Sequence, residues 1–356
     1  MKYNYLNHDI GIKLKNSNNI AIIKLAHIGD SVWMIPFIKN LKKNLPLAKL
    51  TVIVNIASEP LFLLNPYVDK VITYDLNTMK GIWSFYKFIK TIRDINLDAI
   101  FELTDSDRPA YISFLSGADY IIGYNNENLL RNRLYTHISS SLNQRHKNNN
   151  HQVEHHLNIL TELGYEIFDT TIEFNLDPHC YKTLMEKIPE LSNNNGKKIV
   201  VIHPGARNPI RQWGTDRFAQ LCDLLYAKCM IILTAGPNEA ALITEITRLM
   251  KTPLPIIAEN LNLFEFAALC EASDLFIGND SGPLHVAAAK NTFVAGFYGT
   301  ALPEHHAPWT DKKIIIQNND LECRPCYNER CKIPDFKKCL YSITPDEAFE
   351  QIKDVL

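Results

Sequence analysis

Residues 20–36 read IAIIKLAHIGDSVWMIP. The first part of this stretch, Ile20–Ala26, is an apolar run broken only by Lys24, which is typical of a buried strand. Gly29 permits a tight turn after the strand, and we expect a helix from about Ser31 to Asn44. A buried strand that leads directly into a helix begins a βαβ unit, so this stretch predicts a parallel α/β sheet.

The same alternation of short apolar runs and helical stretches continues along the chain. The first half has further predicted strands at Leu50–Asn55, Lys70–Tyr74 and Asp98–Leu103, with a helix over Ile82–Ile95. A second series of strands is predicted at Lys198–His203, Met230–Thr234, Pro255–Ala258, Asp274–Gly278 and Thr292–Tyr298. Its helices are predicted at Gly214–Ala227, Asn238–Met250, Leu263–Glu271, Pro283–Ala289 and Pro345–Leu356. We therefore expect an α/β fold with two Rossmann-like, doubly wound domains that face a central cleft.

The boundary between the two series is predicted at Ser192–Lys198 (SNNNGKK), because Asn and Gly favour turns. This boundary gives an N-terminal domain over residues 1–191 and a C-terminal domain over residues 192–340. The last helix, within residues 341–356, is a candidate to cross back to the N-terminal domain. The polar segment Asn125–Asn150 is expected to be irregular and exposed.

Composition excludes several classes of protein. The chain has 356 residues, 46% of them hydrophobic, so it can bury a core and is not disordered by composition. Lys and Arg number 37 against 39 Asp and Glu, a balance that argues against a dedicated nucleic-acid binder. No apolar run approaches the ~18 residues that suggest a membrane span. The polar N-terminus has no apolar signal region, so we expect a cytoplasmic protein.

The first candidate for chemistry is Asp30, which follows the strand of the opening stretch. A carboxylate at the end of a parallel strand lies at the mouth of the sheet and can act as a general base. The simpler interpretation is that Asp30 or Ser31 caps the helix. The segment alone leaves both interpretations open.

Gly278–His285 (GNDSGPLH) is a second candidate, again between a strand and a helix. A helix start of this kind presents free backbone N–H groups and the positive end of the helix dipole, which suits a diphosphate. His285 lies near the helix start and can add a donor, or it can be a structural histidine. Two further strand ends carry His203–Arg207 (HPGAR) and Gly236–Glu239 (GPNE).

The side chains after these two strands are suited to a nucleotide. Gly205 allows a turn, and the arginines Arg207 and Arg211 can neutralise a phosphate through charge-assisted bonds. Two solvated surface arginines are the alternative. Glu239 can accept bonds from ribose hydroxyls, or it can merely favour the start of the following helix.

Four of the eight cysteines are close together in the sequence, at Cys323, Cys326, Cys331 and Cys339. Their spacings suit a structural zinc or iron site. Plain reduced thiols in a packed loop fit the same spacings, and the sequence leaves both interpretations open.

In chain order, AHIGDSVWMIP, HPGA with a downstream basic-x-Trp, GPNE and DSGPLHVAAA resemble the lipopolysaccharide heptosyltransferases. These are inverting glycosyltransferases of family 9 with the GT-B fold. The resemblance covers roughly Ile20 to Ile352. The CxPCY segment at Cys323–Tyr327 resembles that of the second heptosyltransferase of the inner core.

The resemblance implies transfer of a heptose from an ADP-activated heptose to a hydroxyl of the lipopolysaccharide inner core. Asp30 matches the base that deprotonates the acceptor hydroxyl, and Glu239 matches a ribose-binding acid. Arg211, where the family usually has Lys, matches the cation that stabilises the departing diphosphate. The loop that holds the diphosphate and the donor sugar is matched by Asp280, Ser281, Gly282 and His285. No cofactor or catalytic metal is expected.

The acceptor of the family is a lipid-anchored oligosaccharide at the inner membrane. Arg108, Arg131 and Arg133 are candidates to pair with its carboxylates or phosphates. Lys80–Lys90 (KGIWSFYKFIK) mixes aromatic residues with three lysines and is a candidate for transient contact with an anionic membrane surface, which implies a peripheral protein. An amphipathic helix packed on the sheet is the alternative.

Other functions fit parts of the pattern. One alternative is a GT-B transferase that uses another sugar nucleotide, or a capsule or protein acceptor. Another is a sugar-nucleotide epimerase, which acts without an acceptor. A nucleotide-binding or thiol-metal protein without turnover is the non-enzymatic alternative, and it predicts donor binding alone.

Overall fold

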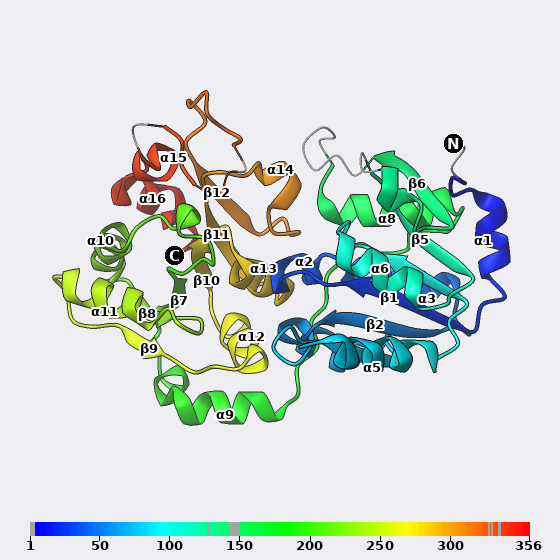
Figure 1. The fold of residues 1–356 in the computed structure, drawn as a ribbon. Coiled ribbons are helices and arrows are strands. Elements are labelled where there is room, and N and C mark those ends of the chain that lie inside the picture. The colour runs from blue at the N-terminus through cyan, green and yellow to red at the C-terminus, as the bar shows by residue number, and fades with distance from the viewer. Residues whose placement is uncertain (1–3, 127–128, 143–149, 327, 329, 334–335) are drawn as a thin grey trace. The chain divides into compact units, whose positions relative to one another are not determined.

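The computed structural model describes residues 4–126, 129–142, 150–326, 328, 330–333 and 336–356. The chain divides into two compact units, Met1–Asn175 and Leu176–Leu356. Each unit contains one six-stranded sheet, and every strand pair is parallel. Helices lie against these sheets (Figure 1). The predicted α/β, doubly wound architecture is therefore confirmed for both halves.

The sheet of the first unit has the strand order β3-β2-β1-β4-β5-β6. Its strands are β1 (Asn19–Lys24), β2 (Lys49–Asn55), β3 (Lys70–Tyr74), β4 (Ala99–Glu102), β5 (Tyr120–Asn125) and β6 (His137–Leu142). Its helices are α1 (His8–Leu14), α2 (Ile28–Val32), α3 (Ile35–Asn44), α4 (Pro60–Leu63), α5 (Ile82–Arg93), α6 (Asp107–Leu115), α7 (Leu129–Asn132) and α8 (Gln152–Glu162), with a 3-10 turn, η1, at Ile56–Ser58. Strand β1 is buried on both faces, which explains why it is apolar at every position between Ile20 and Ile23.

The second sheet repeats this topology, with the order β12-β11-β10-β7-β8-β9. Its strands are β7 (Lys198–His203), β8 (Cys229–Thr234), β9 (Ile256–Ala258), β10 (Leu275–Asn279), β11 (Phe293–Tyr298) and β12 (Lys313–Gln317). Its helices are α9 (His179–Lys187), α10 (Thr215–Leu225), α11 (Ala240–Leu249), α12 (Leu263–Glu271), α13 (Gly282–Ala289), α14 (Pro303–His306), α15 (Lys338–Tyr341) and α16 (Pro345–Ile352). Three 3-10 turns, η2 (Pro189–Ser192), η3 (Pro209–Arg211) and η4 (Lys353–Val355), complete the unit.

Two segments near the predicted boundaries belong to the second unit. Helix α9 is tied to α12 by the Lys187–Glu265 ion pair of 2.7 Å and by the Tyr181–Glu271 hydrogen bond. The Asn-rich segment 192–198 forms the turn between η2 and β7, inside this unit. Helix α16 buries Ala348 and Ile352 in the core beneath α10 and β12, so its apolar face packs on the second unit.

The described parts of the polar segment Asn125–Asn150 are more regular than expected. Residues 127–128 and 143–149 lie outside the described part, but α7 and β6 lie between them. The apolar pattern does not indicate β6, because its sequence, HISSSL, has no apolar run. Ile138 accepts a hydrogen bond from the Leu6 amide on one side, and Glu162 accepts bonds from Ser139 and Ser140. Within the described residues, no helix is long and apolar enough to cross a membrane.

Candidate active site

Both sheets reverse their strand order at one point, between β1 and β4 in the first unit and between β7 and β10 in the second. Open α/β sheets bind ligands outside the carboxyl ends of the strands at such a point. Asp30 follows β1, and the segments at Gly205 and Asp280 follow β7 and β10. The fold therefore places the polar residues chosen from the sequence at the edges where ligands bind.

Trp213 fixes the position of the basic residue two places before it. The indole is fully buried, stacks on Phe297 with ring centroids 4.0 Å apart, and donates from Nε1 to the Ile343 carbonyl at 3.0 Å. Its backbone amide donates to the Asn279 side chain at 2.9 Å. Because the indole is anchored in the core, Arg211 is held at the end of η3, at the carboxyl edge of the sheet.

Arg211 pairs with Asp280, with 3.1 Å between Nη1 and Oδ2. The Asp280 side chain is 7% exposed, whereas that of Arg211 is 41% exposed. A guanidinium has five N–H donors in a planar fork, so one edge can bind this carboxylate while another binds a phosphate. The predicted cation is therefore at the edge of the sheet and partly open to a ligand.

Asn279 connects the loops of the site, and the sequence reasoning did not select it. Its fully buried side chain accepts from the Trp213 amide and donates to the Pro204 carbonyl at 2.7 Å. It thereby joins the ends of β7, η3 and β10. The signal was a polar residue at the last position of an otherwise apolar strand, where a buried amide needs partners from neighbouring loops.

Glu239 lies close to the β7 loop. Its carboxylate accepts from the Gly236 amide at 2.8 Å and lies 3.2 Å from Nε2 of the buried His203. Burial raises the pKa of Glu239, but the bonds from His203 and Gly236 outweigh burial and leave the pKa below its usual value. A Cβ atom at Gly205 would overlap the Glu239 carboxylate, so this close approach requires a glycine.

The start of α13 carries the remaining predicted donor residues. Ser281 is the N-cap residue, with extended backbone, but its side chain makes no capping bond. Its hydroxyl oxygen is buried and finds no hydrogen-bond partner in the described part of the chain. Gly282 begins the helix, and His285 is 4% exposed one turn later. A buried hydroxyl with no partner beside a helix start is suited to a ligand.

The alternative that Asp30 or Ser31 caps α2 is wrong. His27 is the N-cap residue, and the Ser31 hydroxyl bonds back to the His27 carbonyl at 3.0 Å. Gly29 lies inside the first turn of α2 and not in the turn before it. Asp30 is half-buried, and its carboxylate has no hydrogen bond or ion pair to any described residue. An unengaged carboxylate at this edge is available to a substrate.

A buried polar network lies beneath the Asp30 segment, and the sequence reasoning missed it. Lys24 Nζ donates to the Leu103 carbonyl at 2.8 Å and lies 3.0 Å from Nε2 of His156. Burial and the Lys24 charge hold the pKa of His156 well below its usual value, so the ring is neutral and accepts from Lys24. Tyr124 bonds to the other ring nitrogen. Strands β1 and β4 and helix α8 are thereby joined behind the loop.

Glu102 ends β4 and is fully buried. Burial raises its pKa to about 7, although the hydroxyl of Tyr135 at 2.8 Å and the amide of Thr104 at 2.7 Å favour the charged form. The acid is therefore half protonated near neutral pH. It pins the loop that follows β4 at the same edge of the sheet.

The three predicted acceptor arginines differ in their surroundings. Arg131 forms ion pairs with Asp105 at 2.8 Å and Asp107 at 2.9 Å, and these carboxylates already neutralise it. Arg108 is exposed at the start of α6, with its guanidinium 5.8 Å from the ring centroid of Tyr74. Arg133 is exposed just after α7. Arg108 and Arg133 are therefore more accessible to an anion than Arg131.

The cysteine cluster does not form a metal centre in the part of the chain that the structure describes. All four thiols are free, and no three Cys, His, Asp or Glu side chains there are grouped so that they could hold a metal ion. Cys331 Sγ accepts from the Lys337 amide at 3.4 Å. Burial raises the pKa of Cys339. The geometry thus gives no support to a structural zinc or iron site, and Tyr327 of the CxPCY segment lies outside the described residues.

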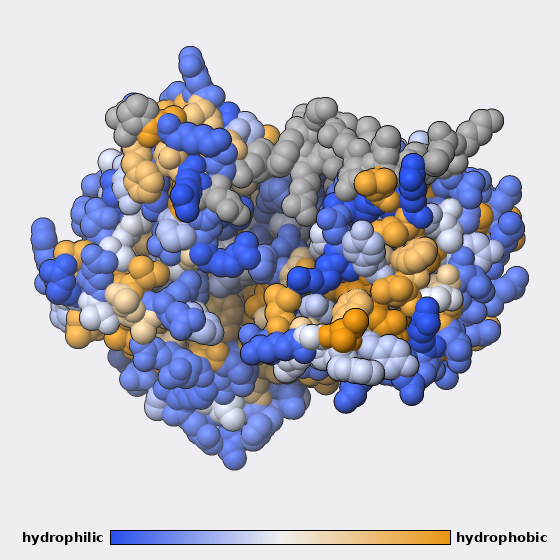
Figure 2. All heavy atoms as spheres, viewed as in Figure 1, coloured by the Kyte–Doolittle hydropathy of each residue, from blue (hydrophilic) through white to orange (hydrophobic). Residues whose placement is uncertain are grey.

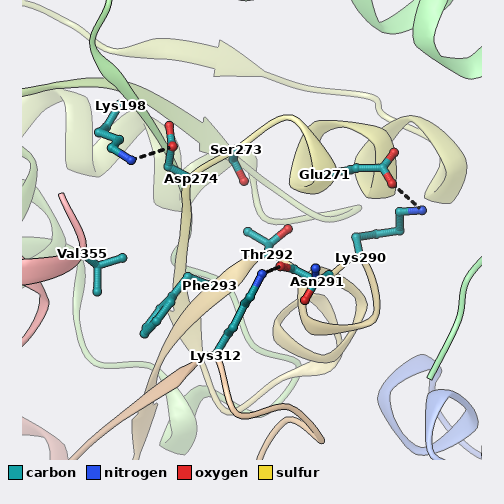
Figure 3. A pocket seen from close by; sticks show the side chains of 10 residues that line it. All are labelled: Lys198, Glu271, Ser273, Asp274, Lys290, Asn291, Thr292, Phe293, Lys312 and Val355. Atoms are coloured by element: carbon teal, nitrogen blue, oxygen red, sulfur yellow. Dashed lines mark hydrogen bonds and ion pairs between the residues drawn. The ribbon is translucent and has the colours of Figure 1, made fainter. Parts of the chain in front are cut away.

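A hollow of about 520 Å³ lies at the opposite edge of the second sheet (Figure 3). Lys198 and Phe293 line it and begin β7 and β11, so it is at the amino ends of the strands. Four of its five charged groups pair with one another, Lys198 with Asp274 at 3.1 Å and Lys290 with Glu271 at 3.0 Å, and Lys312 donates to the Asn291 carbonyl at 3.3 Å. This hollow is therefore separate from the residues predicted to bind the donor.

Two solved structures share the fold over almost the whole chain. The glycosyl transferase family 9 protein from Veillonella parvula has a TM-score of 0.80 and 21% identity, covering 95% of this chain and 97% of that one. The E. coli heptosyltransferase WaaC, solved with ADP, has a TM-score of 0.72 and 16% identity, covering 95% and 100%. These likenesses show the fold of the GT-B heptosyltransferases.

The sequence comparisons give the family. Lipopolysaccharide heptosyltransferase 3 of E. coli (strain K12) is 29% identical over 339 residues, 91% of this chain and 93% of that relative. Lipooligosaccharide heptosyltransferase 2 of Campylobacter jejuni is 29% identical over 167 residues, 46% of this chain and 52% of that relative. The family model described as glycosyltransferase family 9 (heptosyltransferase) matches residues 85–337, more than half of the chain. The chain is an enzyme, a glycosyltransferase, and belongs to glycosyltransferase family 9.

Proposed function

We propose that this enzyme transfers a heptose from an ADP-activated heptose to a hydroxyl of the lipopolysaccharide inner core, with inversion at the anomeric carbon. The observation that carries the proposal is the Asp30 carboxylate, which has no partner among the described residues and lies where the strand order of the first sheet reverses. At the corresponding point of the second sheet lie Arg211, paired with Asp280, and the Glu239 carboxylate, beside His203. The names of the family and of the E. coli relative support the sugar and the acceptor. The ADP in the WaaC structure supports the nucleotide.

In the second unit, each part of the donor has a residue suited to it. The Glu239 carboxylate accepts bonds from the ribose hydroxyls, and the Gly236 amide and His203 hold it in place. The free edge of Arg211 and the start of α13, with the Ser281 hydroxyl, bind the diphosphate. Gly205 provides room for the Glu239 carboxylate, and the exposed Arg207 adds positive charge on the same loop.

Asp280 cannot bind the diphosphate directly, because two anions repel each other. We assign it two other roles. It orients Arg211 through their ion pair, and its carboxylate accepts bonds from hydroxyls of the donor sugar. His285, buried one turn into α13, contributes to the same wall of the site.

The reaction needs one proton acceptor and one site for the departing charge. Asp30 takes the proton of the acceptor hydroxyl as the oxygen attacks the anomeric carbon. The bond between that carbon and the β-phosphate oxygen breaks, and ADP leaves with the electron pair. Arg211 and the N-terminus of α13 stabilise the charge that develops on the diphosphate. In-line attack from the opposite face inverts the configuration.

The acceptor is proposed to be a lipid-linked oligosaccharide that carries anionic groups. Arg108 and Arg133 are the candidates to contact these groups, because both are exposed. Arg131 is held by Asp105 and Asp107 and orders the loops around them. With this acceptor, we propose that the enzyme is cytoplasmic and peripheral at the inner membrane.

The test combines donor binding with turnover in the Asp30→Asn variant. Loss of a general base lowers kcat by about 10²–10⁴-fold. ADP-heptose at about 100 times its Kd raises the free energy of unfolding by about 2.7 kcal/mol, a shift in Tm of roughly 5–10 °C for a unit of this size. We expect the variant to keep this shift while losing transfer.

Asp9→Asn is the matched control, because Asp9 is also in the first turn of a helix of this unit. It removes the same favourable charge from a helix N-terminus but should leave kcat unchanged. Unchanged kcat in Asp30→Asn would remove the base assignment. Stabilisation by another nucleotide sugar in place of ADP-heptose would change the donor, and product formed from the donor alone would indicate an epimerase.

A further inference from the structure

Helix α5 of the first unit presents two apolar faces, of which only one is covered. Phe88, Ile89 and Ile92 are buried against the sheet, in the core that also contains Ile23 and Ile100. This packing confirms the interpretation of residues 80–90 as a helix packed on the sheet, but it uses only one side of the helix. A helix that only covers a sheet is polar on its outer side.

The outer side of α5 is instead rich in large apolar side chains. Ile82, Trp83 and Tyr86 are 79%, 76% and 58% exposed, and Trp83 and Tyr86 contact edge to face with centroids 6.4 Å apart. The neighbouring helix α6 adds Tyr111 and Phe114, which are 55% and 51% exposed. Figure 2 shows apolar side chains over this side of the unit. Large exposed apolar groups that cluster in this way mark a contact surface.

A groove runs along one flank of the helix. It has a volume of about 290 Å³ and is lined by Ile82, Phe85, Tyr86, Ile89, Lys90, Arg93 and Leu115. The lining is mostly apolar and includes two cations. Arg93 also donates from Nε to the Leu115 carbonyl at 2.8 Å, which fixes its guanidinium beside the groove.

Between Asp75 and Asp94, the segment that contains α5 carries charge of one sign. Residues 76–93 contain four basic side chains, Lys80, Lys87, Lys90 and Arg93, and no Asp or Glu. All four are exposed, and none forms an ion pair with a described residue. The whole chain has a net charge of −2, so this concentration is local.

The apolar and basic groups share one face of the helix. At about 100° per residue, Ile82, Tyr86 and Trp83 fall within an arc of about 140° together with Arg93, Lys90 and Lys87. The cations are therefore interspersed with the apolar groups and do not lie on the opposite side of the helix. Lysine stems can lie along an apolar surface while their charges reach outward.

The mixture of apolar and basic side chains on this face suits a lipid bilayer better than a protein partner. The centre of a protein–protein interface is depleted of lysine. A bilayer with anionic lipids accepts the same mixture readily, because aromatic and aliphatic groups enter the headgroup region while lysine and arginine bind phosphates. We propose that the outer face of α5, together with its groove, docks on an anionic phospholipid bilayer. This inference rests on the proposed function, because docking on a bilayer would bring the enzyme to a lipid-linked acceptor.

The experiment measures binding of the full chain to sedimenting vesicles, without any sugar. One set is phosphatidylcholine alone, and the other is phosphatidylcholine mixed with phosphatidylglycerol. We expect binding to the anionic vesicles, weakened by added salt. Lys87→Gln with Lys90→Gln should weaken this binding by about 30-fold, which corresponds to about 1 kcal/mol for each basic residue near an anionic surface. Ile82→Ser with Trp83→Ser should weaken it at least about tenfold.

The matched controls are equally exposed residues elsewhere in the chain. Lys182→Gln with Lys251→Gln removes two charges, and Leu47→Ser with Leu254→Ser removes two apolar groups. Both controls should bind the vesicles like the wild type. All substituted side chains are exposed, so the variants should fold, with Tm values close to that of the wild type.

Three results would overturn the proposal. One is equal binding to both sets of vesicles, and a second is α5 variants that bind like their controls. The third is a wild-type chain that self-associates in sedimentation velocity through this face, with the α5 variants losing that association but not vesicle binding. Stabilisation of the same variants by ADP-heptose is measured separately, so failure of the donor assignment is distinguishable from failure of the docking face.

Discussion

Replacing Gly205 by alanine tests whether the close approach of the β7 loop to Glu239 positions the carboxylate that we propose binds the donor. An added Cβ atom would overlap both carboxylate oxygens of Glu239. Non-bonded contacts of carbon begin near ~3.5 Å, so the carboxylate has to move by about 1 Å. A shift of that size breaks the 2.8 Å bond from the Gly236 amide and the 3.2 Å contact with His203.

The loss of stability in Gly205→Ala follows from the loss of these two contacts. Hydrogen bonds to a charged group contribute about 1.5–3 kcal/mol each. The Glu239 side chain is 20% exposed, so water replaces part of the loss. We expect the free energy of unfolding to fall by about 2 kcal/mol, or roughly 4–8 °C in Tm for a unit of this size. If Glu239 holds the ribose, the Kd for ADP should rise about 10- to 100-fold, because each 1.4 kcal/mol is a factor of about ten.

The assay is calorimetric titration with ADP, together with thermal unfolding, for Gly205→Ala, Glu239→Asp and the double variant. The shorter aspartate withdraws the carboxylate from the new methyl group, so the double variant should lose less stability than the sum of the two single variants, by about 1 kcal/mol. Gly196→Ala is the control for a loss of stability without a contact to Glu239: its φ of +74° strains an alanine, but an added Cβ meets nothing within 4 Å, so its Kd for ADP should equal that of wild type. Wild-type ADP affinity in Gly205→Ala, or strictly additive losses, would refute the reasoning.

Three further predictions concern other parts of the site. Arg211→Ala should lower kcat by about 10²–10³-fold, whereas Arg211→Lys should stay within about tenfold of wild type because the charge remains; equal kcat values for the two variants would contradict this. Trp213→Ala should cost about 3–5 kcal/mol in urea unfolding, since the indole is fully buried and anchors η3, and a loss under about 1 kcal/mol would be inconsistent with that anchor. The folded pKa of Glu102 is raised to about 7, so its contribution to stability is present below the unfolded pKa near 4.5 and is lost as pH rises through 7. Urea unfolding at pH 5 and pH 8 should show this loss, at most about 3 kcal/mol, in the wild type and not in Glu102→Gln; the same pH dependence in both proteins would rule it out.

Burial on both faces makes a strand apolar, and most strands of this kind were predicted, but β5 (YIIGYN) and β12 (KIIIQ) are apolar and were missed. Strands β1, β2, β7 and β10 satisfy this condition, and each was found close to its predicted position. Strand β6 could not be predicted in this way, because its serines are held by Glu162 from a distant helix. The position of α9 likewise depends on pairs with residues about 80 positions later, which local composition does not contain.

The location of the candidate site was predictable from the order of the strands. Parallel strands end at one edge, so polar residues after them indicate that edge before any contact is known. What each side chain does there depends on its neighbours. Arg131 looked like Arg133 in the sequence, yet two carboxylates surround it. The Lys24–His156 contact joins residues 132 positions apart, and no local pattern could indicate it.

The proposed function assigns different chemistry to two units of one topology, and the contacts within each unit support this assignment. In the first unit, the polar network at Lys24 and Glu102 is buried and internally satisfied, which leaves the Asp30 carboxylate without a partner among the described residues. In the second, the groups proposed to bind the donor are themselves partnered, Arg211 by Asp280 and Glu239 by His203, so these charges are already oriented. A free carboxylate suits a base that must accept a proton, whereas oriented charges suit binding of a diphosphate that must leave. It follows that substitutions at Asp30 should change kcat with little effect on donor affinity, and that substitutions at Glu239 should change donor affinity first. A variant of Asp30 that lost ADP binding would show that this separation is wrong.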